Sequence, residues 1–173
     1  MLGAPLTRPP PLYKPPPQDY ETKNFFTTNY TFEDVHVTLA EKIAKISVEA
    51  GCTTYVHLSA LAADHHSKSR WALSKALGED AVRAVCPGAT IVRPADVVGP
   101  EDRLLNLFAK MYQMFPRVPL INGGTARVQP LYVQDLSRAI YAIATSEDER
   151  VMLAQTYDLA GPDEYTIKEV RKR

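Results

Sequence analysis

The sequence predicts an α/β protein built on a parallel sheet, because the same pattern occurs twice. An amphipathic segment at residues 31–50 runs directly into a short apolar run at 53–58. A second helical pattern at 69–85 is followed by another apolar run at 89–92. Helical periods that alternate with short β-branched runs are typical of βαβ units, whose strands are parallel. Because the first helix leads straight into a strand, we expect an earlier parallel strand before residue 31.

Composition limits the class of protein. The 173 residues carry 20 basic and 20 acidic side chains, and 45% are hydrophobic. A chain of this length supports one domain with a core, and its balanced charge argues against binding a polyanion by bulk charge. No apolar run approaches the roughly 18 residues needed to cross a bilayer. Cys52 and Cys86 are too few for a disulfide framework, and with the scattered histidines they are too few for a zinc site.

Residues 1–18 are predicted to be a disordered, proline-rich arm. Half of the 14 prolines lie here, and proline both lacks an amide donor and fixes φ, which favours an extended conformation. The alternative is a ligand for an SH3-type domain. No targeting signal is visible in the arm. We expect residues 19–173 to form the ordered domain, beginning near Tyr20.

The first helix is predicted to begin at Thr31, with Asp34 completing a capping-box-like arrangement. Gly51 supplies the left-handed exit. One apolar stripe recurs at i+3/i+4 spacing and comprises Val35, Leu39, Ile43, Ile46 and Ala50.

The second helix is predicted to begin near Ser67 or Ser69 and to end before Pro87. Gly78 inside it costs about 1 kcal/mol relative to alanine, so we expect close approach of a neighbour there. Its buried stripe is predicted to comprise Leu73, Leu77, Ala81 and Val85.

Shorter elements follow. The strand at 89–92 closes on Arg93-Pro94, and a helix then presents Leu104, Leu107, Phe108 and Met111 on one face. We expect a hairpin-like turn at 122–124, an extended segment at 128–133 and a strand at 156–159. The two remaining helices have N-terminal signals of their own. Asp135 is predicted to cap the helix with the stripe Leu136, Ala139, Ile140 and Ile143, and Thr166 with Glu169 to form a capping box.

The candidate site lies where the first strand ends. Ser59 stands at its carboxyl end, and Trp71 and Lys75, four residues apart, lie on one face of the following helix. Ligands of open α/β sheets bind in the crevice outside the strand ends.

Several segments resemble one family: Tyr20–Phe25, then HLSALAA, SRWALSKALGE, IVRPADVVGPEDRLLN and VQPLYVQDLSRAI. Together they are similar to atypical, extended-type short-chain dehydrogenases/reductases (SDRs). Among these they most resemble the nucleotide-binding accessory subunits of mitochondrial respiratory complex I. The resemblance implies a partial Rossmann-like, doubly wound parallel sheet and NADP or NAD as cofactor. It also implies other complex I subunits as partners and a place at the matrix side of the mitochondrial inner membrane.

The resemblance also implies roles for individual residues. Lys75 would hold the nicotinamide ribose; the alternative is an exposed ion pair with Glu79. Ser59 would be a site hydroxyl; the alternative is a strand-end cap. Trp71 occupies the position of the catalytic tyrosine, and because an indole N–H donates only and does not titrate usefully, we expect no catalytic residue. The loop of Pro94, Ala95, Asp96 and Val97 would pass beside the nicotinamide; the alternative is a simple turn.

One further departure concerns the start of the fold. The family opens with a Gly-rich βαβ turn that binds the pyrophosphate, and the eight glycines here do not form that motif. We therefore expect the chain to be a truncated member lacking this first unit. Two other interpretations stay open: an active epimerase or reductase with Tyr55 as proton donor, and a non-binding fragment or interaction module. Asp64-His65-His66 suggests either a metal ligand pair or a solvated loop.

Overall fold

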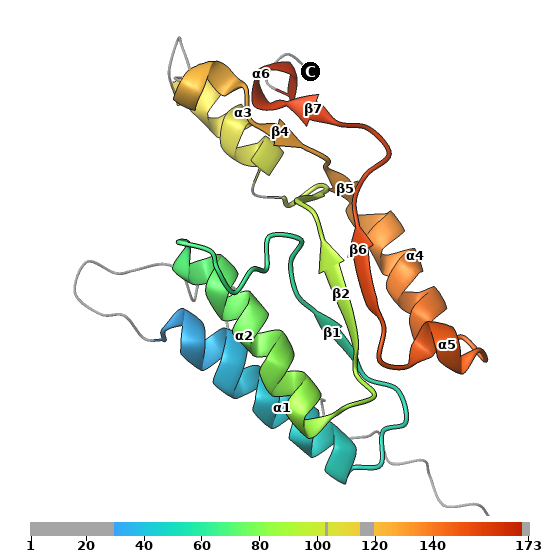
Figure 1. Ribbon diagram of the computed structural model, residues 1–173. Helices are drawn as coiled ribbons and strands as arrows, with labels where there is room; N and C mark the ends of the chain where they lie inside the picture. The colour runs from blue at the N-terminus through green and yellow to red at the C-terminus, as the bar shows by residue number, and fades with distance from the viewer. Residues whose placement is uncertain (1–29, 103, 115–119, 171–173) are drawn as a thin grey trace, which may run out of the picture. The chain divides into compact units, whose positions relative to one another are not determined.

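The computed structural model describes residues 30–102, 104–114 and 120–170 (Figure 1). All helices and strands described below lie in one compact unit, Phe32–Arg173. The predicted proline-rich arm at 1–18, the start of order near Tyr20 and the earlier parallel strand all lie outside the described residues.

A three-stranded parallel sheet forms the centre of this unit. Its strands are β1 (Val56–Leu58), β2 (Thr90–Pro94) and β6 (Thr156–Leu159), in the order β1-β2-β6. In register, His57 pairs with Ile91, and Val92 pairs with Tyr157. The predicted α/β class with a parallel sheet is therefore confirmed.

Helices cover both faces of the sheet (Figure 1). One face carries a π-helical turn η1 (Asp34–Thr38), its continuation α1 (Leu39–Glu49), and α2 (Arg70–Val85). The other face carries α4 (Val133–Ala144), with the short α5 (Glu149–Met152) after it. Because strand side chains alternate between faces, neighbours on β2 enter different cores. Ile91 packs with Ala44 and Val82 on the α1/α2 side, and Val92 packs with Leu136 on the α4 side.

The apolar stripe predicted for the first helix is wrong, because none of its five residues is buried: Val35 and Leu39 are half-buried, and Ile43, Ile46 and Ala50 are exposed. The buried residues of α1 are two alanines outside the stripe. Ala40 and Ala44 are buried, whereas Ile43 and Ile46 are exposed at 38% and 62%. The small alanines let α1 lie close to its neighbours, so the larger side chains of the stripe point outward. The predicted exit is confirmed, since Gly51 has φ +79°.

The start of α2 and its close contact are confirmed, but its predicted buried stripe is wrong. Ser69 is the N-cap and accepts from the Ala72 N–H. A Cβ on Gly78 would lie 2.1 Å from the His36 carbonyl oxygen, so this glycine lets α2 approach η1. Leu77 is 41% exposed. The buried positions are Ala72, Ser74, Ala76, Gly78, Glu79 and Val82.

Short elements complete the described fold. Two of them pair in parallel, β3 (Val97–Val98) with β5 (Leu131–Tyr132), and two antiparallel, β4 (Arg127–Val128) with β7 (Tyr165–Thr166). The remaining elements are α3 (Leu104–Met114), the 3₁₀ segment η2 (Ile121–Gly124) and α6 (Ile167–Val170). The glycine turn is present, with Gly123 at φ +65°. It does not make a hairpin, because β4 after it pairs with β7.

The two predicted caps have different outcomes. Thr166 and Glu169 bond reciprocally, each backbone N–H donating to the other side chain, so the capping box is confirmed. Asp135 does not cap α4, because the N-cap position is Tyr132 and Asp135 instead pairs with Arg138 in the first turn. The apolar stripe of α4 is correct, with Leu136 and Ile143 buried. No helix in the described part of the chain has the length and apolar character needed to cross a membrane.

Candidate functional site

A cavity of about 530 Å³ lies at the carboxyl ends of β1 and β2. One wall contains six of the seven predicted site residues: Ser59, Trp71, Pro94, Ala95, Asp96 and Val97. The lining also includes Arg127, Val128, Gln129 and Glu164. Arg127 and Glu164 form an ion pair 2.7 Å long. The structure therefore brings together residues that the sequence separates by up to 38 positions, from 59 to 97.

Backbone hydrogen bonds place the first wall. The Ser59 N–H donates to the Val92 carbonyl at 2.8 Å, which continues the ladder between β1 and β2 by one residue. Beyond it, the Leu61 N–H donates to the Pro94 carbonyl at 2.9 Å, and the Ala95 N–H donates to Leu159 at 2.8 Å. The loops after both strands are thus held at the edge of the sheet where a ligand of an open α/β fold binds.

Trp71 and Lys75 lie one turn apart on α2, as predicted. The Lys75 Nζ atom is 6.0 Å from the centroid of the Trp71 ring, at the limit of a cation–π contact. Trp71 lines the cavity, but Lys75 is not among the lining residues. The Lys75 ammonium group therefore lies near the indole but outside the cavity lining.

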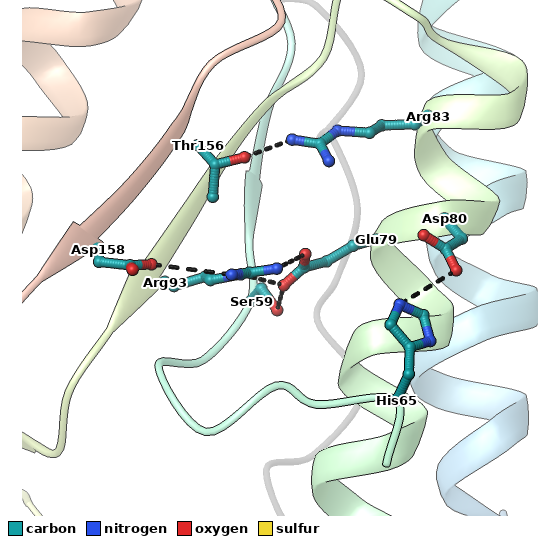
Figure 2. A network of polar contacts seen from close by, with 8 residues as sticks. All are labelled: Ser59, His65, Glu79, Asp80, Arg83, Arg93, Thr156 and Asp158. Carbon is teal, nitrogen blue, oxygen red and sulfur yellow. Dashed lines mark hydrogen bonds and ion pairs between the residues drawn. The ribbon is translucent and has the colours of Figure 1, made fainter. Parts of the chain in front are cut away.

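A buried carboxylate that the sequence reading missed organises this region (Figure 2). Glu79 on α2 is 2% exposed, and its Oε1 atom accepts from the Ser59 hydroxyl at 2.5 Å. Arg93 on β2 binds the same carboxylate with two donors, Nε at 2.9 Å and Nη2 at 2.6 Å. Arg93 also lies 4.0 Å from Asp158 on β6. One helix and three segments of the sheet thus meet at a single ion pair.

The charges in this network reinforce one another. Burial by itself would raise the pKa of Glu79, but the bonds from Arg93 and Ser59 outweigh it and hold that pKa below its ordinary value. The bond to Glu79 raises the pKa of Arg93 although burial opposes it. Both groups are therefore ionised.

This network bears on two alternatives considered for the site residues. Ser59 lines the cavity, as the site-hydroxyl interpretation expects, and its hydroxyl donates to Glu79. An exposed Lys75–Glu79 surface pair is wrong, since Glu79 is buried and accepts from Arg93.

His57 on β1 lies two residues before Ser59, so the two side chains point to the same face of the sheet. Burial lowers the pKa of His57, and the Lys75 ammonium lowers it further, to about 4, against an opposing effect of Glu79. The imidazole is therefore neutral at physiological pH and adds no positive charge beside Lys75.

Tyr55, the alternative proton donor, faces the core. It packs against the cluster of Ala40, Ala44, Val82, Ala89 and Ile91, and it is not among the residues lining the cavity. Burial raises the pKa of its phenol, with a further rise from Cys86. A catalytic phenol needs the opposite shift.

Side chains of the Asp64-His65-His66 loop make polar contacts with other groups of the same chain. The Asp64 carboxylate accepts from the His66 backbone N–H, and His65 lies 3.4 Å from Asp80. Within the described ranges, no group of three His, Cys, Asp or Glu side chains is placed to hold a metal ion.

Residues 22–154 match the NAD dependent epimerase/dehydratase family, and the chain belongs to that family. The fold agrees: the NAD complex of dTDP-glucose 4,6-dehydratase from Bacillus anthracis superposes with a TM-score of 0.69, over 82% of this chain and 51% of that one, at 18% identity.

Two curated relatives narrow the comparison. The chain is 40% identical over 154 residues to the mitochondrial NADH dehydrogenase [ubiquinone] 1 alpha subcomplex subunit 9 of Arabidopsis thaliana, and 42% identical over 151 residues to that of Mus musculus. These alignments cover 88% and 87% of this chain but only 37% and 38% of the relatives. The chain thus spans well under half the length of these two relatives.

Proposed function

We propose that this chain carries the nicotinamide side of a nucleotide site in a non-catalytic accessory subunit of mitochondrial complex I. The observation that carries the proposal is Trp71. It stands on the wall of a cavity at the strand ends of an NAD dependent epimerase/dehydratase fold, at the position where the resemblance puts the catalytic tyrosine. The cavity wall thus presents an indole where the resemblance places a phenol.

The residues present fit one half of a nicotinamide dinucleotide. A cavity of about 530 Å³ is within the usual range for small-molecule sites. The indole of Trp71 offers a flat face for a ring, and the backbone from Pro94 to Val97 forms the adjacent edge. Lys75, behind the indole, would reach the ribose hydroxyls. The bound cofactor, NADP or NAD, would accept a hydride in its oxidised form and donate one in its reduced form.

This chain's own residues would bind and orient that half rather than move protons. Within the described cavity lining, the titratable side chains are Asp96, Arg127 and Glu164, and the last two are paired with each other. An indole cannot exchange a proton with a substrate oxygen. An active epimerase or reductase would need another donor, and Tyr55 is turned into the core.

Partners and location follow from the relatives. The subunits of Arabidopsis and mouse are named as mitochondrial subunits of NADH dehydrogenase [ubiquinone]. We infer the same complex as the partner of this chain, and the matrix side of the inner membrane as its place.

The test is the fate of the protein in its own cells. An antibody raised against this chain should detect its antigen in the mitochondrial fraction, and on native gels it should migrate with complex I activity. Depletion of other complex I subunits should remove the complex I band and leave the antigen outside that position of the gel. An antigen found only free, or only outside mitochondria, would contradict the proposal.

A further inference from the structure

The direction of the hydrogen bond between Ser59 and Glu79 has a chemical consequence for the cavity. A serine hydroxyl has one proton to donate and two lone pairs that accept. The Ser59 proton is used, because its oxygen lies 2.5 Å from Glu79 Oε1 in a buried contact. Ser59 itself is 5% exposed and lines the cavity.

Glu79 cannot reverse this bond. An ionised carboxylate only accepts, and both of its oxygens also receive donors from Arg93. Bidentate, charge-assisted bonds of this kind fix geometry as well as charge. The Ser59 proton therefore points toward α2, and only lone pairs of its oxygen are left for anything in the cavity.

We propose that Ser59 is a specificity-determining residue that only accepts hydrogen bonds, so that this wall of the cavity selects a ligand N–H or O–H group and does not polarise a carbonyl oxygen. This inference rests on the proposed function, and there the group is the amide N–H of a nicotinamide or a hydroxyl of its ribose. Trp71 complements Ser59, because its indole N–H donates and does not accept. Glu79 acts through Ser59 and is a positioning residue.

The test uses three mononucleotide probes and the full chain. Nicotinamide mononucleotide has both donor groups. Its 3-acetylpyridine analogue keeps the carbonyl oxygen but loses the amide N–H, and its dideoxyribose analogue loses the sugar hydroxyls. Dissociation constants come from ligand-observed NMR. We expect one analogue to bind about three- to tenfold more weakly than the parent, as for one lost hydrogen bond, and the analogue affected identifies the group.

Two variants assign that preference to Ser59. Ser59→Ala removes the acceptor, so the parent and the affected analogue should bind equally. Replacing the ion pair in the double variant Glu79→Leu/Arg93→Leu leaves no buried charge unpaired, and it frees the Ser59 hydroxyl to donate or accept. Because the freed hydroxyl can donate to a carbonyl oxygen, the penalty for the 3-acetylpyridine analogue should then shrink below about twofold, the lower end of one weak hydrogen bond. If the double variant does not fold, the comparison of the native chain with Ser59→Ala decides.

The possible failures separate the two claims. Equal binding of all three probes by the native chain, or a preference that survives Ser59→Ala, overturns the role of Ser59 and leaves the proposed function standing. Absence of binding by any probe contradicts the nicotinamide site itself, and the role of Ser59 falls with it.

Discussion

The Ser59 hydroxyl lies 2.5 Å from Glu79 Oε1, and this bond joins the end of β1 to the middle of α2 (Figure 2). Arg93 brings β2 to the same carboxylate. The cavity wall at Ser59 is thus fixed by a contact between residues 20 positions apart. Three elements that border the cavity depend on one buried side chain.

Glu79→Ala should be strongly destabilising, because it leaves the Arg93 guanidinium without its main partner. We expect a loss of about 2–4 kcal/mol in the free energy of unfolding; the value is reduced from that of a fully buried pair because Arg93 is 29% exposed. Urea unfolding measures it. The control is Asp135→Ala, which removes an exposed pair with Arg138 and should cost under about 0.5 kcal/mol. Equal effects of the two changes would contradict the network.

Stability should fall as the pH drops from about 6.5 toward 4, because of His57. The pKa of this imidazole is lowered to about 4 in the folded chain from an ordinary 6.5. Between these values the unfolded chain binds more protons than the folded one, so stability decreases as pH falls. In His57→Asn, melting temperatures over this window should depend less steeply on pH. A His57→Asn profile as steep as the native one would count against this role.

Gly78→Ala should destabilise the protein, although the same change in an ordinary helix stabilises it by about 1 kcal/mol. The added Cβ would meet the His36 carbonyl oxygen at 2.1 Å, so α2 and η1 must separate. We expect a cost of about 1–3 kcal/mol in thermal or urea unfolding. Gly88→Ala is the matched control, since its Cβ meets only Leu153 Cδ2, at an ordinary 3.8 Å. A stabilised Gly78→Ala protein would refute the close contact.

Local signals in the sequence identified features that depend on neighbouring residues alone. Ser69 as a cap, Gly51 as an exit and the Thr166–Glu169 box are each determined within a few residues. The strand ends at Ser59 and Pro94 followed from β-branched runs, and in a parallel sheet such ends meet at one edge. That is why most predicted site residues line one cavity.

Features set by distant contacts were not predictable in this way. The buried face of α2 consists largely of small or polar residues such as Ala72, Ala76 and Glu79, which carry no apolar periodicity. Glu79 is buried with Arg93, 14 residues later in the sequence, as a hydrogen-bond partner. Leu77 suggested a core position by its hydrophobicity but is exposed. The available sequence signal for the Glu79–Arg93 pair was a glutamate four residues after Lys75, followed later by the Arg93-Pro94 strand end.

Replacing Trp71 by tyrosine addresses the missing chemistry. The native chain should transfer no hydride from NADPH or NADH to carbonyl substrates, because general acid–base help, typically about 10²–10⁴-fold, is absent. Trp71→Tyr restores a phenol one helical turn from Lys75 and should raise turnover above background. Lys75→Ala serves as the binding control in the same assay. Substantial turnover by the native chain, unaffected by Lys75→Ala, would mean that the site lies elsewhere.

The most direct measurement uses the fluorescence of Trp71, the single tryptophan of the sequence, which lines the cavity. If this cavity holds the nicotinamide half of a dinucleotide, nicotinamide mononucleotide should quench the indole in a saturable way, and adenosine monophosphate should not. NADPH should bind less than about tenfold more tightly than the mononucleotide, because the sequence offers no Gly-rich turn for its pyrophosphate. Fluorescence that is unchanged by nicotinamide mononucleotide, or quenched equally by adenosine monophosphate, would contradict the nicotinamide site.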